Sequence, residues 1–208
     1  MVTKYPFIAI LLIMAMASIF GTCKKGGLGC ADTVYSFQIS ENVTPDKDSI
    51  RIGDTIFLNV NTPTKLNDLQ SGNLVDYSNA GNLGNVVSLL RFLPANEYRG
   101  AISNFNLIIL KGTEVNSIDP LSQKDVLFGE ENGFYKFSMA VIPKDTGRYV
   151  LTISNAANVY RKNNKCTKAS FTIDFQSTNQ HFYFLQLWRP DLILDEKGKK
   201  KVYYFKVY

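Results

Sequence analysis

The sequence YKFSMAV at residues 135–141 alternates between apolar side chains and polar or small ones. Successive side chains of a β-strand point to opposite faces of the sheet, so this alternation is typical of a strand with one buried face and one wet face. The same period of two recurs along the chain, at residues 35–39 (YSFQI), 56–61 (IFLNVN), 148–153 (RYVLTI) and 168–175 (KASFTIDF). We therefore predict an all-β chain built from antiparallel sheets.

Two further segments, residues 86–93 and 107–110, are apolar on both faces, and we expect them in central strands. Turn residues separate the apolar runs, for example Asn132-Gly133 and Asp145-Thr146-Gly147. No segment between residues 33 and 176 carries an apolar stripe of helical period. These observations predict a β-sandwich.

Two local motifs refine the class. The stretch IRIGDTIFL at residues 50–58 resembles the strand–turn–strand start of bacterial immunoglobulin-like domains, and DTGRY at residues 145–149 resembles the D-x-G-x-Y run of their tyrosine corner. The resemblance covers roughly residues 33–176 and implies an immunoglobulin-like antiparallel β-sandwich. Leu151 stands where antibody domains have a cysteine, so the resemblance is to the architecture. Such folds have many unrelated roles, and no function follows from the motif.

The N-terminus reads as an export signal. Lys4 precedes an apolar run at residues 7–20, which as a helix would be about 21 Å long and too short for the ~30 Å hydrocarbon core. The following residues, Phe20-Gly21-Thr22-Cys23, resemble the lipobox of bacterial lipoproteins in the loose form found in the Bacteroidota. The resemblance implies cleavage before Cys23 and a membrane anchor through a lipid on that cysteine. Secretory cleavage near Ala15-Met16-Ala17 and an uncleaved anchor helix over residues 5–22 are the alternatives.

We thus predict a lipoprotein signal peptide at residues 1–22, a lipidated tether at 23–32 and the sandwich with a C-terminal extension at 33–208. Lys24-Lys25 follows the lipidation site, where lipoproteins of this group destined for the cell surface commonly carry acids. We therefore expect an outer membrane lipoprotein of the cell envelope that faces the periplasm.

The two other cysteines fit an oxidising compartment. Cys30 and Cys166 form an even pair, which in an exported protein predicts a disulfide. Two distant thiols and a single histidine, His181, do not make a metal site, and we expect no cofactor.

Two segments lie outside the strand pattern. Residues 62–85 are polar and rich in Asn and Gly, with a turn at residues 70–73, which favours a small hairpin over one end of the sandwich. In the C-terminal extension, Asn179 is placed to cap a short helix through Trp188 that ends before Pro190, although residues 182–188 are aromatic enough for a strand. Residues 202–208 predict a final strand.

Composition and motifs argue against several functions. The chain is 45% hydrophobic with a net charge of +5, which excludes a disordered protein and lacks the clustered charge of a nucleic-acid binder. It has no phosphate-binding, nucleophile-elbow or zinc-protease motif. The adjacent acids Glu130 and Glu131 would point apart on a strand or turn, unlike a glycosidase pair. We do not expect an enzyme.

The candidate binding residues are few. Asp68, Asn73 and Asp76 offer oxygen ligands to Ca²⁺ but lack the dense acidic spacing of a dedicated loop. Tyr77 and Trp188 would contribute to a binding surface if the long loop and the C-terminal segment meet, and core packing is the alternative. The lysines at residues 197 and 199–201 form either a solvated turn or a contact for anionic headgroups or glycans.

The prediction is a non-enzymatic envelope lipoprotein whose sandwich binds an unknown protein or glycan, and no nucleic acid. A structural spacer or assembly subunit of an envelope complex is the first alternative. An exported hydrolase that uses carboxylates alone is the second.

Overall fold

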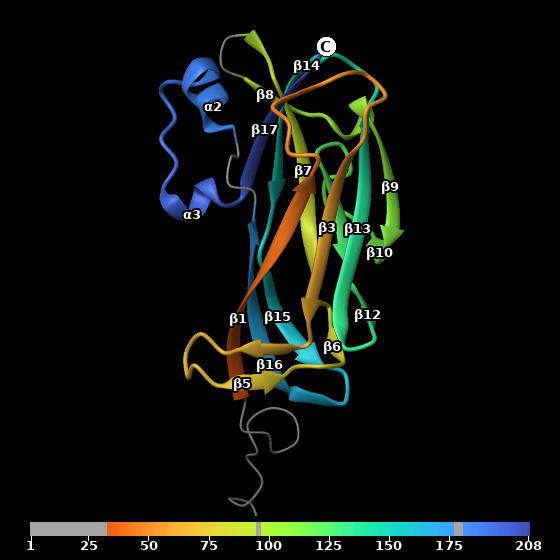
Figure 1. The fold of residues 1–208 in the computed structure, drawn as a ribbon, viewed down its shortest axis with the longest axis vertical. Coiled ribbons are helices and arrows are strands. Elements are labelled where there is room, and N and C mark those ends of the chain that lie inside the picture. The colour runs from red at the N-terminus through yellow and green to blue at the C-terminus, as the bar shows by residue number, and fades with distance from the viewer. Residues whose placement is uncertain (1–32, 95–96, 177–180) are drawn as a thin grey trace, which may run out of the picture. The chain divides into compact units, whose positions relative to one another are not determined.

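The alternating segments form two β-sheets packed face to face, with β1, β3 and β13 in one layer and β7, β14 and β17 in the other (Figure 1). The computed structural model describes residues 33–94, 97–176 and 181–208. Residues Thr33–Tyr208 form one compact unit. The fold is an immunoglobulin-like β-sandwich, as the sequence predicts.

In sheet order, the first sheet consists of β12 (Gly129–Glu131), β13 (Phe134–Pro143), β3 (Ile56–Pro63), β1 (Thr33–Thr44), β16 (Asn164–Phe175), β15 (Ala156–Arg161) and β6 (Ala80–Gly81), and β9 (Phe105–Lys111) also pairs with β13. The second sheet consists of β10 (Thr113–Val115), β11 (Gln123–Leu127), β7 (Gly84–Phe92), β14 (Gly147–Ile153), β17 (Val202–Val207) and β2 (Ser49–Ile50), and β8 (Tyr98–Gly100) also pairs with β7. A 3-10 turn, η2 (Ile102–Asn104), precedes β9.

The core lies between the two sheets and follows the alternation. On β13, Tyr135, Phe137, Met139 and Val141 are at most 1% exposed. Burial of each large apolar side chain contributes about 1.5–3 kcal/mol relative to leaving it in water, so the interior face of the strand is a major source of stability.

Two strand pairings are parallel, where the sequence predicts antiparallel sheets throughout. β1 runs parallel to β16 from Thr33 to Glu41 and then pairs antiparallel with β3 from Asn42 to Thr44. β17 and β2 are also parallel. Side chains alternate between the two faces in parallel and antiparallel pairs alike, so the alternation does not indicate strand direction. These partners also lie far apart in the chain, so no hairpin turn between them indicates an antiparallel pair.

The prediction that residues 107–110 lie in a central strand is wrong, whereas β7, which holds residues 86–92, is central. β9 pairs only with β13 among the described residues and ends the sheet. Ile108 is 42% exposed and Leu110 is 55% exposed. An apolar run on both faces identifies neither the sheet position nor what covers the outer face.

The tyrosine corner is confirmed. The Tyr149 hydroxyl is 3.2 Å from the carbonyl oxygen of Asp145, to which it donates, and it accepts from Asn104 Nδ2 at 3.2 Å. Its ring is fully buried and lies 4.8 Å from that of Phe105 between centroids. The corner therefore ties the start of β14 to the turn before β9.

The predicted hairpin within residues 62–85 is also present, as β4 (Lys65–Asn67) and β5 (Leu74–Asp76). It is held to β1 by a hydrogen bond from the Leu69 amide to the Ser36 carbonyl at 2.7 Å. The segment is thus an ordered part of the domain.

The C-terminal extension contains two short helices, α2 (Phe182–Trp188) and α3 (Glu196–Lys199), before β17. The helical alternative for residues 182–188 is therefore correct. Its N-cap is His181, in the left-handed region at φ 58°, and the predicted cap Asn179 lies outside the described residues.

Candidate ligand-binding site beside the C-terminal helices

Helix α2 is anchored to the outer face of the second sheet. Phe184, Leu185 and Trp188 form a separate apolar cluster with Phe92, Val150 and Tyr204. The Trp188 ring lies 5.1 Å from that of Phe92. This packing fixes the position of the extension on the sandwich.

His181 secures the start of the same helix. Its ring is 4% exposed, with Nδ1 3.0 Å from the Tyr204 carbonyl oxygen and Nε2 3.4 Å from Asp46 Oδ1. An imidazole held on both sides in this way has a structural role.

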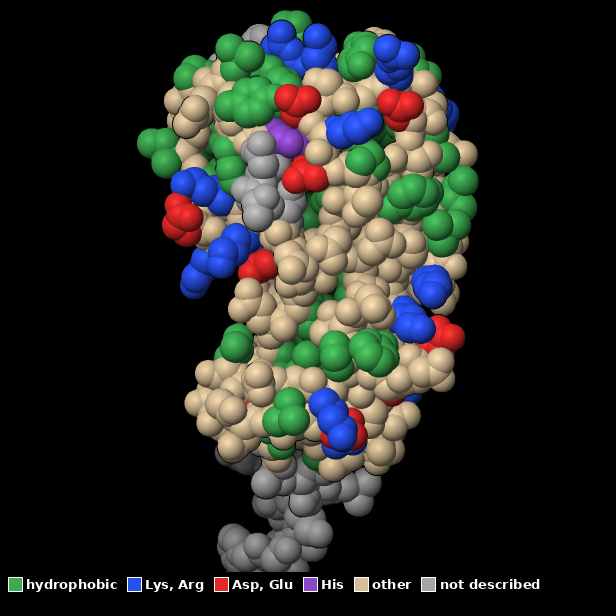
Figure 2. Space-filling model, in the orientation of Figure 1, with side chains coloured by type: hydrophobic (Ala, Val, Ile, Leu, Met, Phe, Trp, Pro, Cys, Tyr) green, Lys and Arg blue, Asp and Glu red, His purple; other side chains and the backbone are tan. Residues whose placement is uncertain are grey.

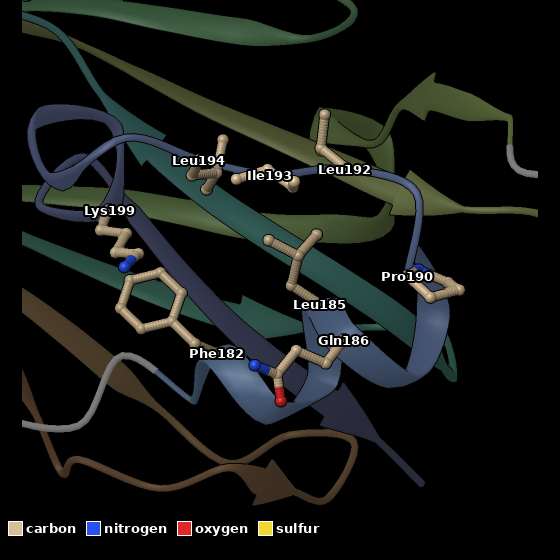
Figure 3. Close-up of a pocket in the computed structure, with 8 residues that line it drawn as sticks. All are labelled: Phe182, Leu185, Gln186, Pro190, Leu192, Ile193, Leu194 and Lys199. Atoms are coloured by element: carbon tan, nitrogen blue, oxygen red, sulfur yellow. The ribbon is translucent and has the colours of Figure 1, made fainter.

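An apolar groove runs between α2 and the chain that follows it. The cavity has a volume of about 320 Å³. Figure 3 shows Leu192, Ile193 and Leu194 in sequence along one wall, with Leu185 directed toward them from α2. Lys199 and Phe182 lie at one end of this groove and Pro190 at the other. The groove offers apolar contact and one ammonium group.

A second, polar cavity lies beside α3. We call it the lysine pocket, and it has a volume of about 290 Å³. It is lined by Gln38, Asn155, Thr172, Asp174, Lys197, Lys200 and Lys201. Figure 2 shows the basic side chains near α3 on the left margin of the molecule.

The parallel pairing of β1 and β16 builds the floor of the lysine pocket. Gln38 lies opposite Thr172 in the register, and both belong to the outer face of the first sheet. Asp174 has the same phase on β16 but is only 7% exposed, because the turn from α3 to β17 covers it. Residues distant in sequence thus converge where β1 and β16 pair.

Asp174 is the acceptor that organises the pocket. Its Oδ1 is 2.8 Å from Lys201 Nζ, and its Oδ2 accepts from Gln38 Nε2 at 2.9 Å. Lys201 Nζ also donates to Asn155 Oδ1 at 2.5 Å and to the Ile173 carbonyl. Lys201 is therefore a structural cation, held in place by three acceptors.

Lys197 and Lys200 are different, because both are exposed and neither has an ion pair within the part of the chain that the structure describes. The three lysines and Asp174 give the pocket a formal charge of +2. Two exposed ammonium groups beside amide and hydroxyl groups suit a hydrogen-bonding anion.

A buried acid lies behind the pocket, in the interior of the sandwich. Glu41 is 0% exposed, and burial raises its pKa to about 8, opposed by the hydrogen bond from Asn85 and the charge of Lys201. Its Oε1 has no hydrogen bond among the described residues. A raised pKa is typical of a general acid, but Glu41 faces the core and cannot reach a ligand in either cavity.

The sequence-predicted calcium ligands serve the hairpin instead. Asp68 accepts from the amides of Ser36 at 2.8 Å and Ser71 at 2.9 Å, and these hydrogen bonds lower its pKa. Asp76 accepts from the Ser78 amide at 2.9 Å, while Asn73 is exposed. No group of three or more His, Cys, Asp or Glu side chains with metal-binding geometry is found in the described ranges.

Tyr77 and Trp188 do not form a common surface. Tyr77 is fully buried in the main core, and its hydroxyl donates to the Val159 carbonyl at 3.0 Å. Trp188 is 8% exposed in the separate cluster under α2. For both residues the core-packing alternative is correct.

Sequence reasoning identified the lysines of the pocket but missed Gln38, Asn155, Thr172 and Asp174. Asp174 occupies one of the polar positions of an alternating strand, and a polar residue is the usual choice on the outer face of a sheet. Its position in the sequence therefore does not mark it as part of a site. Only the pairing of β1 with β16 brings these residues together.

The predicted lipidation and disulfide sites fall largely outside the described residues, which exclude Cys23 and Cys30. Cys166 lies on β16 and is half-buried. Because Cys30 is outside the described residues, the pairing of the two cysteines stays a prediction. Among the helices that are described, none has the length and hydropathy needed to cross a membrane.

No family model matches the chain, and no curated protein is significantly similar to it. Among solved structures, a non-cellulosomal cohesin from the hyperthermophilic archaeon Archaeoglobus fulgidus is similar over 71% of this chain and 97% of its own. The TM-score is 0.27 and the sequence identity 12%. A similarity at this level carries no argument about function.

Proposed function

We propose that this protein is a non-enzymatic binding module of the cell envelope that captures an anionic glycan in the lysine pocket. The observation that carries the proposal is the exposure of Lys197 and Lys200 around a cavity whose floor is polar and fixed. The Asp174–Lys201 pair and Gln38 hold that floor before any ligand arrives, so little ordering is needed on binding.

The chemistry of the pocket favours an acidic sugar over other anions. Two ammonium groups attract a carboxylate or sulfate, and Gln38, Asn155 and Thr172 supply amide and hydroxyl groups for sugar hydroxyls. A nucleic acid would need a long basic stripe to follow its backbone. A pocket with two exposed ammonium groups suits one charged sugar residue at a time.

The envelope location rests on the N-terminal sequence. Phe20-Gly21-Thr22-Cys23 supports cleavage and lipidation at Cys23, and Lys24-Lys25 supports the periplasmic side of the outer membrane. The tether at residues 23–32 would hold the sandwich near the membrane.

The test is a glycan array probed with the purified full chain in detergent. We expect binding to acidic oligosaccharides, decreasing as salt rises. Lys197→Glu together with Lys200→Glu should abolish this binding, because the formal charge of the pocket changes from +2 to −2.

The matched control is Lys162→Glu together with Lys165→Glu, which makes the same change in net charge. Lys165 and Asp174 lie on the same strand about 30 Å apart, at ~3.3 Å per residue. This control should bind as the wild type does. Equal loss in both double variants, or no acidic glycan bound by the wild type, would contradict the proposal.

A further inference from the structure

β9 is an unusual end for a sheet. In the described part of the chain, the other strands that end the two sheets are β12, β6, β10, β8 and β2, and each is two or three residues long. β9 spans seven residues and, among the described strands, pairs with β13 on one side only. Its outer edge therefore presents a row of backbone N–H and C=O groups to solvent.

The edge also lacks most of the features that prevent strands from pairing. Phe105, Leu107 and Ile109 pack on the core, and the outer face carries Asn106, Ile108 and Leu110. Lys111, at the very end, is the single charged residue of the strand, and a register shift is confined to that end. A long apolar edge of this kind is a template for another strand.

An apolar strip crosses the outer face of the sheet and ends at this edge. Ala140 of β13 lies opposite Phe57 of β3 on one side and Ile108 of β9 on the other. Ala140 is only 5% exposed, although it faces outward, because its two neighbours cover it. Figure 2 shows hydrophobic side chains gathered at the right margin of the molecule, where Figure 1 places β9.

We propose that two copies of this chain associate through β9, with the two edges paired antiparallel about a two-fold axis so that the first sheets become continuous. Dimers with two-fold symmetry are the most common homo-oligomers, and they require a self-complementary surface. β9 meets this requirement because its single charge, Lys111, lies at one end, so that two antiparallel copies do not place like charges opposite each other.

An antiparallel register centred near Ile108 places Lys111 of each copy opposite the uncharged start of the other strand. No like charges face each other. On the outer face, Ile108 of one copy lies opposite Ile108 of the other, and Leu110 of each copy lies opposite Asn106 and diagonal to that Ile108 pair. Apolar cross-strand pairs of this kind stabilise sheets.

The order of strands leaves the lysine pocket accessible in such a dimer. β13 and β3 separate β9 from β1 and β16, which form the floor of the pocket. Dimerisation is therefore independent of the proposed glycan binding, and the dimer would present two pockets to a repeating ligand.

The test is sedimentation of the full chain in density-matched detergent, at a large excess of micelles over protein. We expect a dimer for the wild type and a monomer for Ile108→Lys, which sets two ammonium groups near each other at the two-fold axis. Val34→Lys is the control, because Val34 is 55% exposed on β1, away from this edge. It should remain dimeric.

Amide hydrogen exchange at residues 105–111 shows whether the strands themselves pair. Protection there should increase with protein concentration in the wild type and not in Ile108→Lys. A monomeric wild type, a dimer that survives Ile108→Lys, or a dimer with unchanged exchange at β9 would each overturn the proposal. Protection that arises only when a different protein is added would also overturn it, in favour of a foreign strand.

Discussion

Glu41 on β1 accepts a hydrogen bond from the side-chain amide of Asn85 on β7 at 2.5 Å, across the interior of the sandwich. Asn85 is 4% exposed, and its Oδ1 accepts from the Ser154 amide at 2.9 Å. The two sheets are thus joined by a buried polar contact in which the side-chain amide of Asn85 lies between the Glu41 carboxyl group and the Ser154 amide. An ionised carboxylate at this position would be costly to bury, so the protonated form is favoured.

This contact predicts that stability falls as the pH rises. The pKa of Glu41 is about 8 in the folded protein and near its ordinary value of 4.5 in the unfolded chain. The folded state therefore binds more protons between these two values. The contribution of Glu41 is fully present below about pH 4.5 and is lost as the pH rises through 8, at about 1.4 kcal/mol per pH unit. Urea unfolding at a series of pH values measures this slope.

Glu41→Gln should remove the slope, since the amide keeps the shape and does not ionise. The variant should also be more stable than the wild type at pH 9. Glu130→Gln, at an exposed acid, should keep the wild-type slope. If Glu41→Gln unfolds with the same pH dependence as the wild type, Glu41 is not the group responsible.

The position of Glu41 in the core is visible in the sequence, but its hydrogen-bond partner is not. On β1, Phe37, Ile39, Glu41 and Val43 occupy successive interior positions. The acid is therefore visible in the sequence as an interruption of the apolar phase, and it marks a buried polar group. The position of its partner Asn85, on the other sheet, depends on packing and is not visible.

In the rest of the molecule too, the sequence predicts features that depend on neighbouring residues and does not predict contacts between distant segments. The tyrosine corner and the alternating strands depend on neighbouring residues, and the sequence predicts them. The parallel pairing of β1 with β16 and the edge position of β9 depend on contacts between distant segments. The lysine pocket needs that parallel pairing, so the sequence indicates its lysines and not its floor.

Tyr149→Phe tests the contribution of the tyrosine corner. The change removes the hydroxyl that donates to the Asp145 carbonyl and accepts from Asn104, while the ring stays in the core. We expect a loss of about 1 kcal/mol in the free energy of unfolding, the usual net value of one hydrogen bond. Tyr208→Phe, at a residue 55% exposed, should leave the free energy unchanged. A similar loss in both variants would argue against a special role for the corner.

Two neighbouring positions on α2, one buried and one exposed, test how much the packing of this helix contributes to stability. Trp188→Ala should cost about 3–5 kcal/mol, because Trp188 fills the cluster with Phe92 and Phe184. Leu187→Ala, one residue earlier and 71% exposed, should cost little. Thermal unfolding compares the two, and hydrogen exchange in α2 shows whether the helix has detached. Little destabilisation by Trp188→Ala would mean that the helix does not depend on this contact.

The disulfide between Cys30 and Cys166 remains a prediction from the sequence. Cys166 lies on β16, where Thr167 pairs with Thr33 of β1, and Thr33 is three residues after Cys30. A bond here would attach the tether to the start of the sandwich. Peptide mapping of envelope protein without reductant should find the two cysteines linked. Recovery of both as free thiols would exclude the bond.

Lipidation at Cys23 is the last prediction, and it decides where the proposed binding module would act. The apolar run at residues 7–20 and the following Gly21-Thr22-Cys23 predict cleavage and acylation. Cells labelled with a radioactive fatty acid should incorporate label into the wild type and not into Cys23→Ala. Cys30→Ala is the matched control and should retain the label, because it lies seven residues beyond the predicted cleavage site. Label in the Cys23→Ala protein would place the lipid on another residue, and no label in the wild type would favour secretion or an uncleaved anchor. In either case the glycan-binding test on the purified chain would still stand, because the lysine pocket is formed entirely within residues 33–208.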